Sequence, residues 1–144
     1  MSSAQQKGNS HGVVTGYVIV GGAAVLTLLH LGVLGLVLAV ISIFFTAAQI
    51  KNSDSDIHIT HLRWQRRTAS ILLLSMLALL GWIGYEAVVT MTSSAAGFEE
   101  IFAVLAVHWL AHTIVSVVTA LWMMLRVIKG LLRHTDYKPM YAIR

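Results

Sequence analysis

Four ionisable side chains lie inside stretches of the sequence that are otherwise apolar. His30 lies in the first stretch, Glu86 in the second, and His108 and His112 in the third. Ionisable groups are costly inside a membrane, so we expect each of them to face another helix or a bound group rather than lipid. His108 and His112 are four residues apart, which places both imidazoles on one face of a helix. The spacing therefore predicts a polar stripe directed into a helical bundle.

Three chemistries fit these residues. Two imidazoles from different helices can ligate a b-type haem, here His30 with His108 or His112. The His108 and His112 pair with Glu86 can hold a divalent metal ion, and a chain of Glu and His can relay protons. The alternative is that neutral histidines only hold helices together by hydrogen bonds. None of these spacings is diagnostic of a metal or haem site, so we favour the packing role and predict no metal site. Of the three chemistries, haem binding fits the residues best.

The composition decides the class of protein that carries these residues. The chain has 144 residues, of which 57% are hydrophobic and 11% charged, and its mean hydropathy is +0.77. Soluble domains carry about a quarter charged residues, so the chain is expected to be an integral membrane protein. It contains no cysteine, which excludes disulfides, thiolate metal sites and cysteine nucleophiles. No catalytic triad pattern, phosphate loop or nucleotide fingerprint is present, and we predict that the chain is not an enzyme.

Three apolar stretches predict an all-α, three-span helical bundle, with spans at about 17–50, 69–91 and 101–125. The first stretch would form a helix of roughly 50 Å, whereas the hydrocarbon core is about 30 Å thick. The first stretch either tilts and protrudes or breaks near Gly21 or Gly32 into an interfacial piece and a span, and we favour one span with a protruding or kinked N-terminal part. A hairpin is the alternative that stays open. A polar tail over 1–16 precedes the single membrane domain, 17–140, and a short end, 141–144, follows it. Within the domain, 51–68 is a polar connector and 126–133 an amphipathic extension along the interface.

The basic residues predict the topology. Four Lys and Arg lie within 51–68 and five lie beyond residue 125, whereas the connector at 92–97 carries none. The positive-inside rule then places both basic stretches, and the C-terminus, in the cytoplasm. The N-terminus is periplasmic with three spans and cytoplasmic if the first stretch is a hairpin. Because the basic clusters alternate with apolar spans, they favour anionic headgroups as neighbours and argue against nucleic acid.

Two stretches resemble the signature motifs of one family. The run from His61 to Thr68, HLRWQRRT, resembles H-x-R-W-Q-x-R-T, and the run from Arg126 to Met140, RVIKGLLRHTDYKPM, resembles R-I-V-K-G-L-L-x-L-x-D-G-K-P-M. Together they resemble a family of small bacterial inner-membrane proteins of unknown function, loosely grouped with the inner-envelope component of chloroplast protein import. Tyr137 stands where the family has a turn glycine. The resemblance implies a multi-pass inner-membrane protein of three spans, with a cytoplasmic connector and a cytoplasmic tail.

Both motifs are expected at one cytoplasmic interface. There, Asp136 can pair with Arg63 or Arg67, and Gln65 can tie the helix ends together. These positions either dock a partner or bind headgroups and fix the span ends, and both alternatives remain open. The candidate interaction residues are His61, Arg63, Trp64, Gln65, Arg67, Arg126, Lys129, Asp136 and Lys138.

The predicted function follows from the size of the bundle. Three spans bury only a slender core, and two neighbours do not easily satisfy the polar stripe on the third span. We therefore predict a lipid-embedded accessory, assembly or stabilising subunit of a larger membrane complex, or a homo-oligomer. The first alternative is a haem-b electron-transfer subunit that uses the transmembrane histidines. The second is a small transporter or protein-import component that works as an oligomer, which rests on family analogy. Tyr17 is expected to be an interface anchor.

Overall fold

The computed structural model describes residues 3–92 and 97–141, with side chains from residue 11 onward. Within these ranges the chain forms four α-helices and no strand: α1 (Ser3–Leu28), α2 (Gly32–Lys51), α3 (Asp56–Thr92) and α4 (Phe98–Thr135). All four are long and apolar enough to cross a membrane. The prediction of an all-α fold with helices that could span a membrane is therefore confirmed for the described residues, whereas the number of such helices is four and not three.

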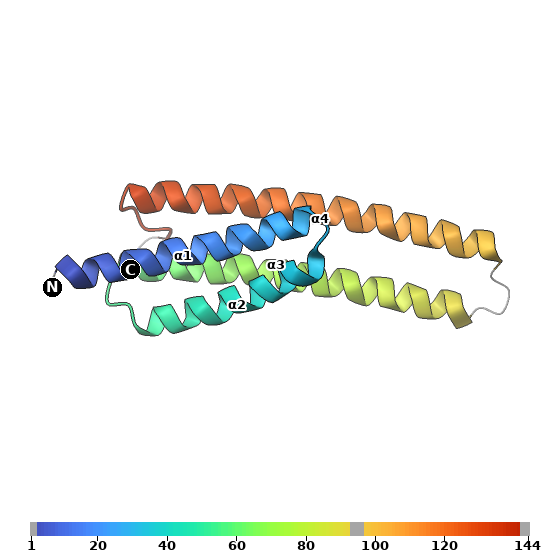
Figure 1. Cartoon of the computed structure of the whole chain (residues 1–144), viewed down its shortest axis with the longest axis horizontal. Helices are drawn as coiled ribbons and strands as arrows, with labels where there is room; N and C mark the ends of the chain where they lie inside the picture. The colour runs from blue at the N-terminus through green and yellow to red at the C-terminus, as the bar shows by residue number, and fades with distance from the viewer. Residues whose placement is uncertain (1–2, 93–96, 142–144) are drawn as a thin grey trace.

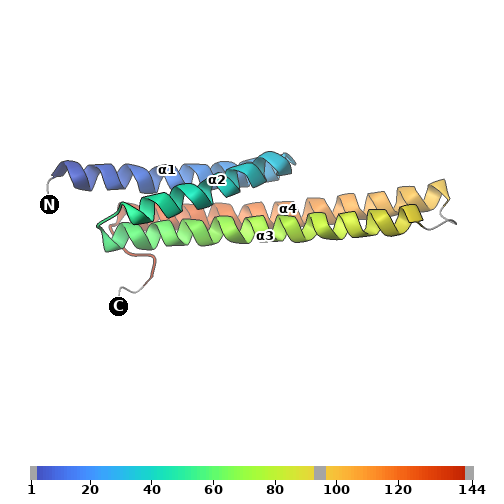
Figure 2. The same cartoon turned by 90° about the horizontal axis from the view of Figure 1, so that it is seen from below.

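The helices alternate in direction and form two hairpins of unequal length (Figure 1). Helices α1 and α2 make the short hairpin, and α3 and α4 make a long one of 37 and 38 residues. Helix α1 packs against the other three, and α2 packs against α1 and α3. Figure 2 shows that the short hairpin lies along only one part of the long hairpin. The molecule is a four-helix bundle at one end and a two-helix hairpin at the other.

The favoured single helix over 17–50 is wrong, because the chain reverses at residues 29–31. The amide of His30 donates to the carbonyl of Thr27 (3.2 Å), and that of Leu31 donates to the carbonyl of Leu26 (2.9 Å). His30 has a φ of 60°. This pair of bonds around a left-handed residue is the Schellman motif that ends many helices. The break falls next to Gly32, which was the alternative position, and Gly32 begins α2.

Two other predicted boundaries also change. The expected polar tail 1–16 is helical from Ser3 onward, and the 51–68 connector shrinks to residues 52–55 because α3 begins at Asp56. The third span was expected to continue through 126–133, and α4 does continue through this extension to Thr135. Of the predicted end 141–144, only Tyr141 lies within the described residues. Packing against α1 explains the straight continuation of α4.

Small side chains bring the helices close together. The main buried cluster is Val20, Ala23, Ala24, Ala39, Ala69, Leu72, Met76 and Met123. Large apolar side chains instead lie on the outside along all four helices, among them Val33, Phe44, Leu74 and Phe102. Close approach through small residues is the usual packing mode of helices in lipid. An exterior this apolar fits a hydrocarbon environment and not water.

Two glycines mark the closest helix contacts, both near the end of the bundle where four helices meet. A Cβ placed on Gly16 of α1 would collide with the side chain of Gln65 on α3. A Cβ placed on Gly130 of α4 would collide with the ring of Tyr17 on α1. Gly81 and Gly84, in the part of α3 beyond the short hairpin, have open space around them.

These contacts predict opposite effects for the same substitution at two positions. Gly130→Ala should lower the free energy of unfolding by about 1–3 kcal/mol, because the new methyl group overpacks the contact with Tyr17. Gly84→Ala should leave stability unchanged or raise it by up to about 1 kcal/mol, because alanine is the better helix former. Thermal unfolding in detergent, followed by circular dichroism, measures both. A Gly130→Ala protein as stable as Gly84→Ala would contradict this packing.

Candidate functional site

The first family-like motif divides into an inner and an outer face on α3. His61, Gln65 and Thr68 are fully buried, whereas Arg63 and Arg67 are exposed. The division follows from helical periodicity, since residues three, four and seven apart share a face. The motif is therefore divided between residues inside the bundle and residues on its surface.

His61 connects three parts of the chain. Its Nδ1 lies 2.8 Å from the hydroxyl of Tyr17 on α1, and its Nε2 lies 3.0 Å from the carbonyl oxygen of Lys138, beyond α4. Because a carbonyl can only accept, Nε2 carries the proton and Nδ1 accepts from the tyrosine hydroxyl. Neutral His61 is thus satisfied at both nitrogens. Tyr17, expected to be an interface anchor, is a core residue instead.

Gln65 and Arg126 add two more links at the same end. Gln65 Nε2 donates to the carbonyl oxygen of Val13 (2.8 Å), which ties α3 to α1. Arg126 Nε donates to Thr68 Oγ1 (2.9 Å), which ties α4 to α3. The guanidinium of Arg126 also lies 3.5 Å from the ring centre of Trp64, a cation–π contact. Each of these groups would be costly in lipid without its partner.

The segment after α4 folds back over α3, and we call residues 136–141 the C-terminal strap. The amide of Met140 donates to Thr60 Oγ1 (3.1 Å), and the Met140 side chain is buried. Arg133 donates to the carbonyl oxygen of Pro139 (3.1 Å). Tyr141 meets the ring of Trp64 edge to face at 5.7 Å. The two motifs, far apart in sequence, thus form one folded unit.

The strap begins where the family-like motif departs from its pattern. Tyr137, at the position of the usual glycine, has a φ of 52°. The amide of Lys138 donates to the carbonyl of Arg133 (2.9 Å), which closes a second Schellman motif at the end of α4. Asp136 pairs with Lys138 (3.1 Å), and not with Arg63 or Arg67 as predicted. The reason is local, since the turn places the two side chains together.

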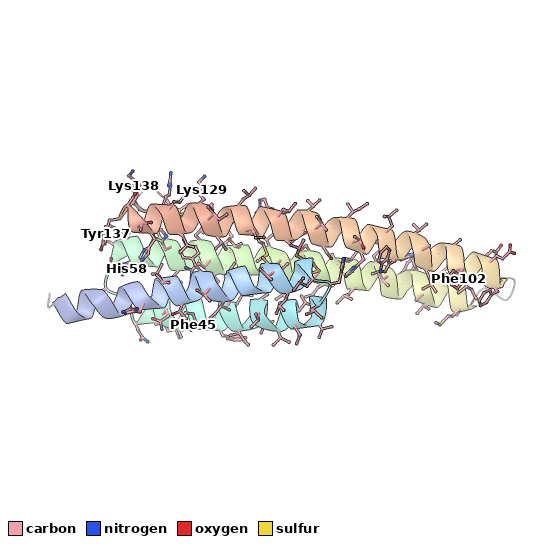
Figure 3. All side chains as sticks on the ribbon, turned by 45° about the horizontal axis from the view of Figure 1, so that its top comes forward. Phe45, His58, Phe102, Lys129, Tyr137 and Lys138 are labelled. Atoms are coloured by element: carbon pink, nitrogen blue, oxygen red, sulfur yellow. The ribbon has the colours of Figure 1, made fainter. Side chains whose placement is uncertain are left out.

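Cationic side chains surround this end of the bundle on the outside. We call the exposed set the basic belt, and it consists of Lys51, Arg63, Arg66, Arg67, Lys129 and Arg133. Among the described residues none of the six forms an ion pair. Figure 3 shows Lys129 and Lys138 directed outward at this end, and Phe102 near the other. The belt and the buried links occupy the same level of the molecule.

The predicted histidine cluster is only partly assembled. The rings of His30 and His112 lie 5.9 Å apart, and His30 also stacks on Trp109 at 6.5 Å. His108 turns elsewhere, toward Trp82 at 5.0 Å, and its Nδ1 lies 2.6 Å from the carbonyl oxygen of Val104. Its Nε2 is buried and, within the described residues, has no hydrogen-bond partner.

Glu86 does not complete a metal site with these histidines. Across residues 3–92 and 97–141, no group of three or more His, Cys, Asp or Glu side chains could hold a metal ion. Glu86 is half-buried. What the arrangement offers chemically is one pair of facing imidazoles, from the turn at His30 and from His112 on α4.

Comparisons with protein-family models, with curated proteins and with solved structures find no match to this chain. The resemblance described for the two motifs therefore stays a prediction.

Sequence reasoning missed two further histidines near His61. The ring of His134 lies 5.2 Å from that of His61 and 5.7 Å from that of His58. These residues come from α3 and α4 and have no shared spacing in the sequence. Only the antiparallel pairing of the two helices, with the strap folded back, brings the three rings together.

Burial keeps the three imidazoles neutral at this polar end, outside the apolar segments. It lowers the pKa of His61 to about 4, with Arg133 and the neighbouring histidines contributing, and the Lys138 carbonyl acting in the opposite direction. Burial also lowers the pKa values of His58 and His134. Because the unfolded chain binds these protons first as pH falls, the folded state loses stability below the ordinary histidine pKa of about 6.5.

The lowered pKa values predict how stability depends on pH. The free energy of unfolding should be constant above about pH 7, decline as the pH falls toward 4, and depend less on pH below that value. His61→Gln keeps a donor for Lys138 and removes the titrating group, so it should flatten the decline. Chemical unfolding in detergent at several pH values measures the slope. His11→Gln, at an exposed position, is the control, and equal slopes in the two variants would refute the assignment.

Proposed function

We propose that this protein is an accessory or assembly subunit of a larger membrane complex in the bacterial inner membrane. The proposal rests on one observation: in both motifs some residues join the helices inside the bundle, whereas others are exposed on its surface. His61, Gln65 and Arg126 are engaged in joining the helices. Arg63 and Lys129 point outward, and among the described side chains they have no acidic partner. The outer set is thus available to another molecule.

The form of the basic belt suits a protein partner. Arg63 and Arg67 are one helical turn apart on α3. The first turns of this helix are held in place by the bond from Gln65 to α1 and by the strap. Two guanidinium groups one turn apart on a helix can bind two carboxylates, each in a bidentate fashion. Complementary charge of this kind selects and orients partners. An acidic surface on a neighbouring subunit is therefore the partner we propose.

The positive-inside rule supports the orientation. The basic belt lies at the end that holds both the α2–α3 connection and the C-terminal strap. The other end, at the α3–α4 connection, begins α4 with Glu99 and Glu100. We therefore propose that the belt and the C-terminus are cytoplasmic.

If a partner docks on Arg63 and Arg67, assembly of the complex should depend on the positions of these two residues and not only on the total charge of the basic belt. Arg63→Ala with Arg67→Ala should reduce the yield of co-purified subunits about tenfold, because two charge pairs of up to roughly 1 kcal/mol each are lost. Arg66→Ala with Lys129→Ala removes the same charge from the same belt and is the matched control. Mild detergent extraction followed by native mass spectrometry measures both complexes.

Two results would refute docking through Arg63 and Arg67. One is an unchanged complex in the Arg63 and Arg67 double variant. The other is an equal loss in both double variants, which would indicate that the belt acts through its total charge on anionic headgroups. A variant that fails to fold is recognised by its thermal midpoint in detergent, and lysine in place of both arginines then repeats the test.

A second candidate function is a haem-b subunit, and one observation favours it. His30 and His112 come from different helices and their ring centres are 5.9 Å apart. If a haem were bound, His30 and His112 would supply the two imidazoles that hold its iron, and the haem would supply electron transfer. A flat porphyrin between them would have to displace Trp109, which stacks on His30.

The haem candidate predicts a coloured protein. Purified from cells supplied with haem, it should have a Soret band that His30→Ala and His112→Ala each abolish. His108→Ala should leave the band in place, because that ring packs on Trp82 instead. Visible absorbance spectroscopy is the measurement, and a colourless wild-type protein overturns this candidate without affecting the docking proposal.

A further inference from the structure

The short hairpin ends halfway along the apolar part of the long one. His30, at the tip of the hairpin, packs on His112 of α4. His112 is fourteen residues from Arg126 and fourteen from Phe98. At helical rise this is about 21 Å in each direction. Figures 1 and 2 show the same relation, with α1 and α2 ending near the middle of α3 and α4.

The length of the apolar segments matches one bilayer. From Thr68, which is bound by Arg126, to Thr92 at the end of α3 is twenty-four residues, or about 36 Å. The hydrocarbon core is about 30 Å thick. A bilayer that covers this segment has one boundary at the basic belt and the other near the α3–α4 connection. The tip of the short hairpin then lies near the middle of the bilayer.

One alternative position of the bilayer, centred on α1 and α2, conflicts with the exposed residues. If the bilayer were centred on α1 and α2, the far parts of α3 and α4 would stand in water. Those parts expose large apolar side chains: Trp82, Tyr85, Val88, Val89, Met91, Phe98, Phe102, Leu105 and Val107. The same shift would also draw Arg63 and Arg67 into the hydrocarbon, because Gln65 beside them is level with Val13 of α1. Length and composition let α1 and α2 cross a membrane, but their position beside α3 and α4 does not.

We infer that α1 and α2 form a re-entrant hairpin, which enters the membrane at the basic face, turns at His30 and returns to the same face. Helices α3 and α4 alone cross the bilayer. The N-terminus, the α2–α3 connection and the C-terminal strap then share one side. The exposed apolar side chains of the hairpin, such as Val18, Val33 and Phe44, contact the acyl chains of the leaflet on that side.

Several backbone amides of the turn are hydrogen-bonded internally, as backbone at that depth requires. The amides of Leu29, His30 and Leu31 donate to carbonyls of α1, and that of Gly35 donates to Leu31. Thr27 directs its hydroxyl back to the carbonyl of Ala23 (2.8 Å). The His30 ring between Trp109 and His112 fixes the tip against α4.

Re-entry gives the protein a different cross-section in each leaflet. Four helices occupy the leaflet on the basic side, and two occupy the other. The exposed surface of the hairpin therefore binds lipid, and its partner is the acyl chains of one leaflet. This placement of the chain in the bilayer does not depend on a partner complex.

Single-cysteine variants test this placement, because the chain contains no cysteine of its own. His11→Cys and Asn52→Cys mark the basic face, Gly97→Cys marks the opposite face, and Leu29→Cys marks the tip; all four positions are exposed on the protein. Each variant is treated with a membrane-impermeant maleimide in right-side-out and in inverted vesicles. Labelling after detergent solubilisation provides the control for accessibility.

We expect His11→Cys and Asn52→Cys to react in the same vesicle orientation and Gly97→Cys only in the other. Leu29→Cys should react in neither until detergent is added. A fluorophore attached there in detergent and returned to vesicles should be quenched most by lipids brominated near the ends of their acyl chains. Reaction of Leu29→Cys from the Gly97 side would mean that α1 and α2 span the bilayer. Reaction from the His11 side would put the hairpin outside it, and either result overturns the inference.

Discussion

The arrangement of this protein depends on the two hydrogen bonds of one neutral imidazole. His61 accepts from Tyr17 on α1 and donates to the Lys138 carbonyl beyond α4, so one side chain of α3 holds the first and last parts of the chain. The bond to Tyr17 requires the close approach of α1 to α3 and α4, which Gly16 and Gly130 permit. A buried histidine with one nitrogen unpaired would destabilise the bundle. The helices must therefore be in register before this end is stable.

The sequence predicted the long hairpin better than the short one. Apolar runs with basic flanks identify α3 and α4, and the two motifs were expected at one end, where Gln65 does join two helices. The sequence gives little sign of the reversal at His30. The residue with the left-handed backbone conformation is a histidine and not a glycine, and apolar residues continue on both sides. A Schellman turn is defined by backbone bonds, which composition does not reveal. For the same reason, the strap became visible only in the structure.

The histidines were harder to place than the helices that carry them. Spacing puts His108 and His112 on one helix face, yet His112 meets His30 while His108 meets Trp82. The two histidines differ because the short hairpin ends beside His112. His108 lies beyond the tip of the hairpin and cannot contact it. The rotation of each helix is set by small residues such as Ala24 and Ala120 in the core. A pattern of apolar and polar residues does not encode that rotation.

The two ends of the molecule differ in the kind of contact that joins their helices. Interhelical hydrogen bonds from side chains, such as those of Gln65 and Arg126, lie at the basic end, where water and headgroups are near. In the far half, α3 and α4 meet through apolar side chains and the Trp82–His108 contact. In lipid, apolar contacts alone give little drive for helices to associate, because acyl chains replace them at little cost. The interhelical hydrogen bonds of Gln65 and Arg126 therefore strengthen association at the basic end, and a neighbour that binds the basic belt would act on that part of the fold.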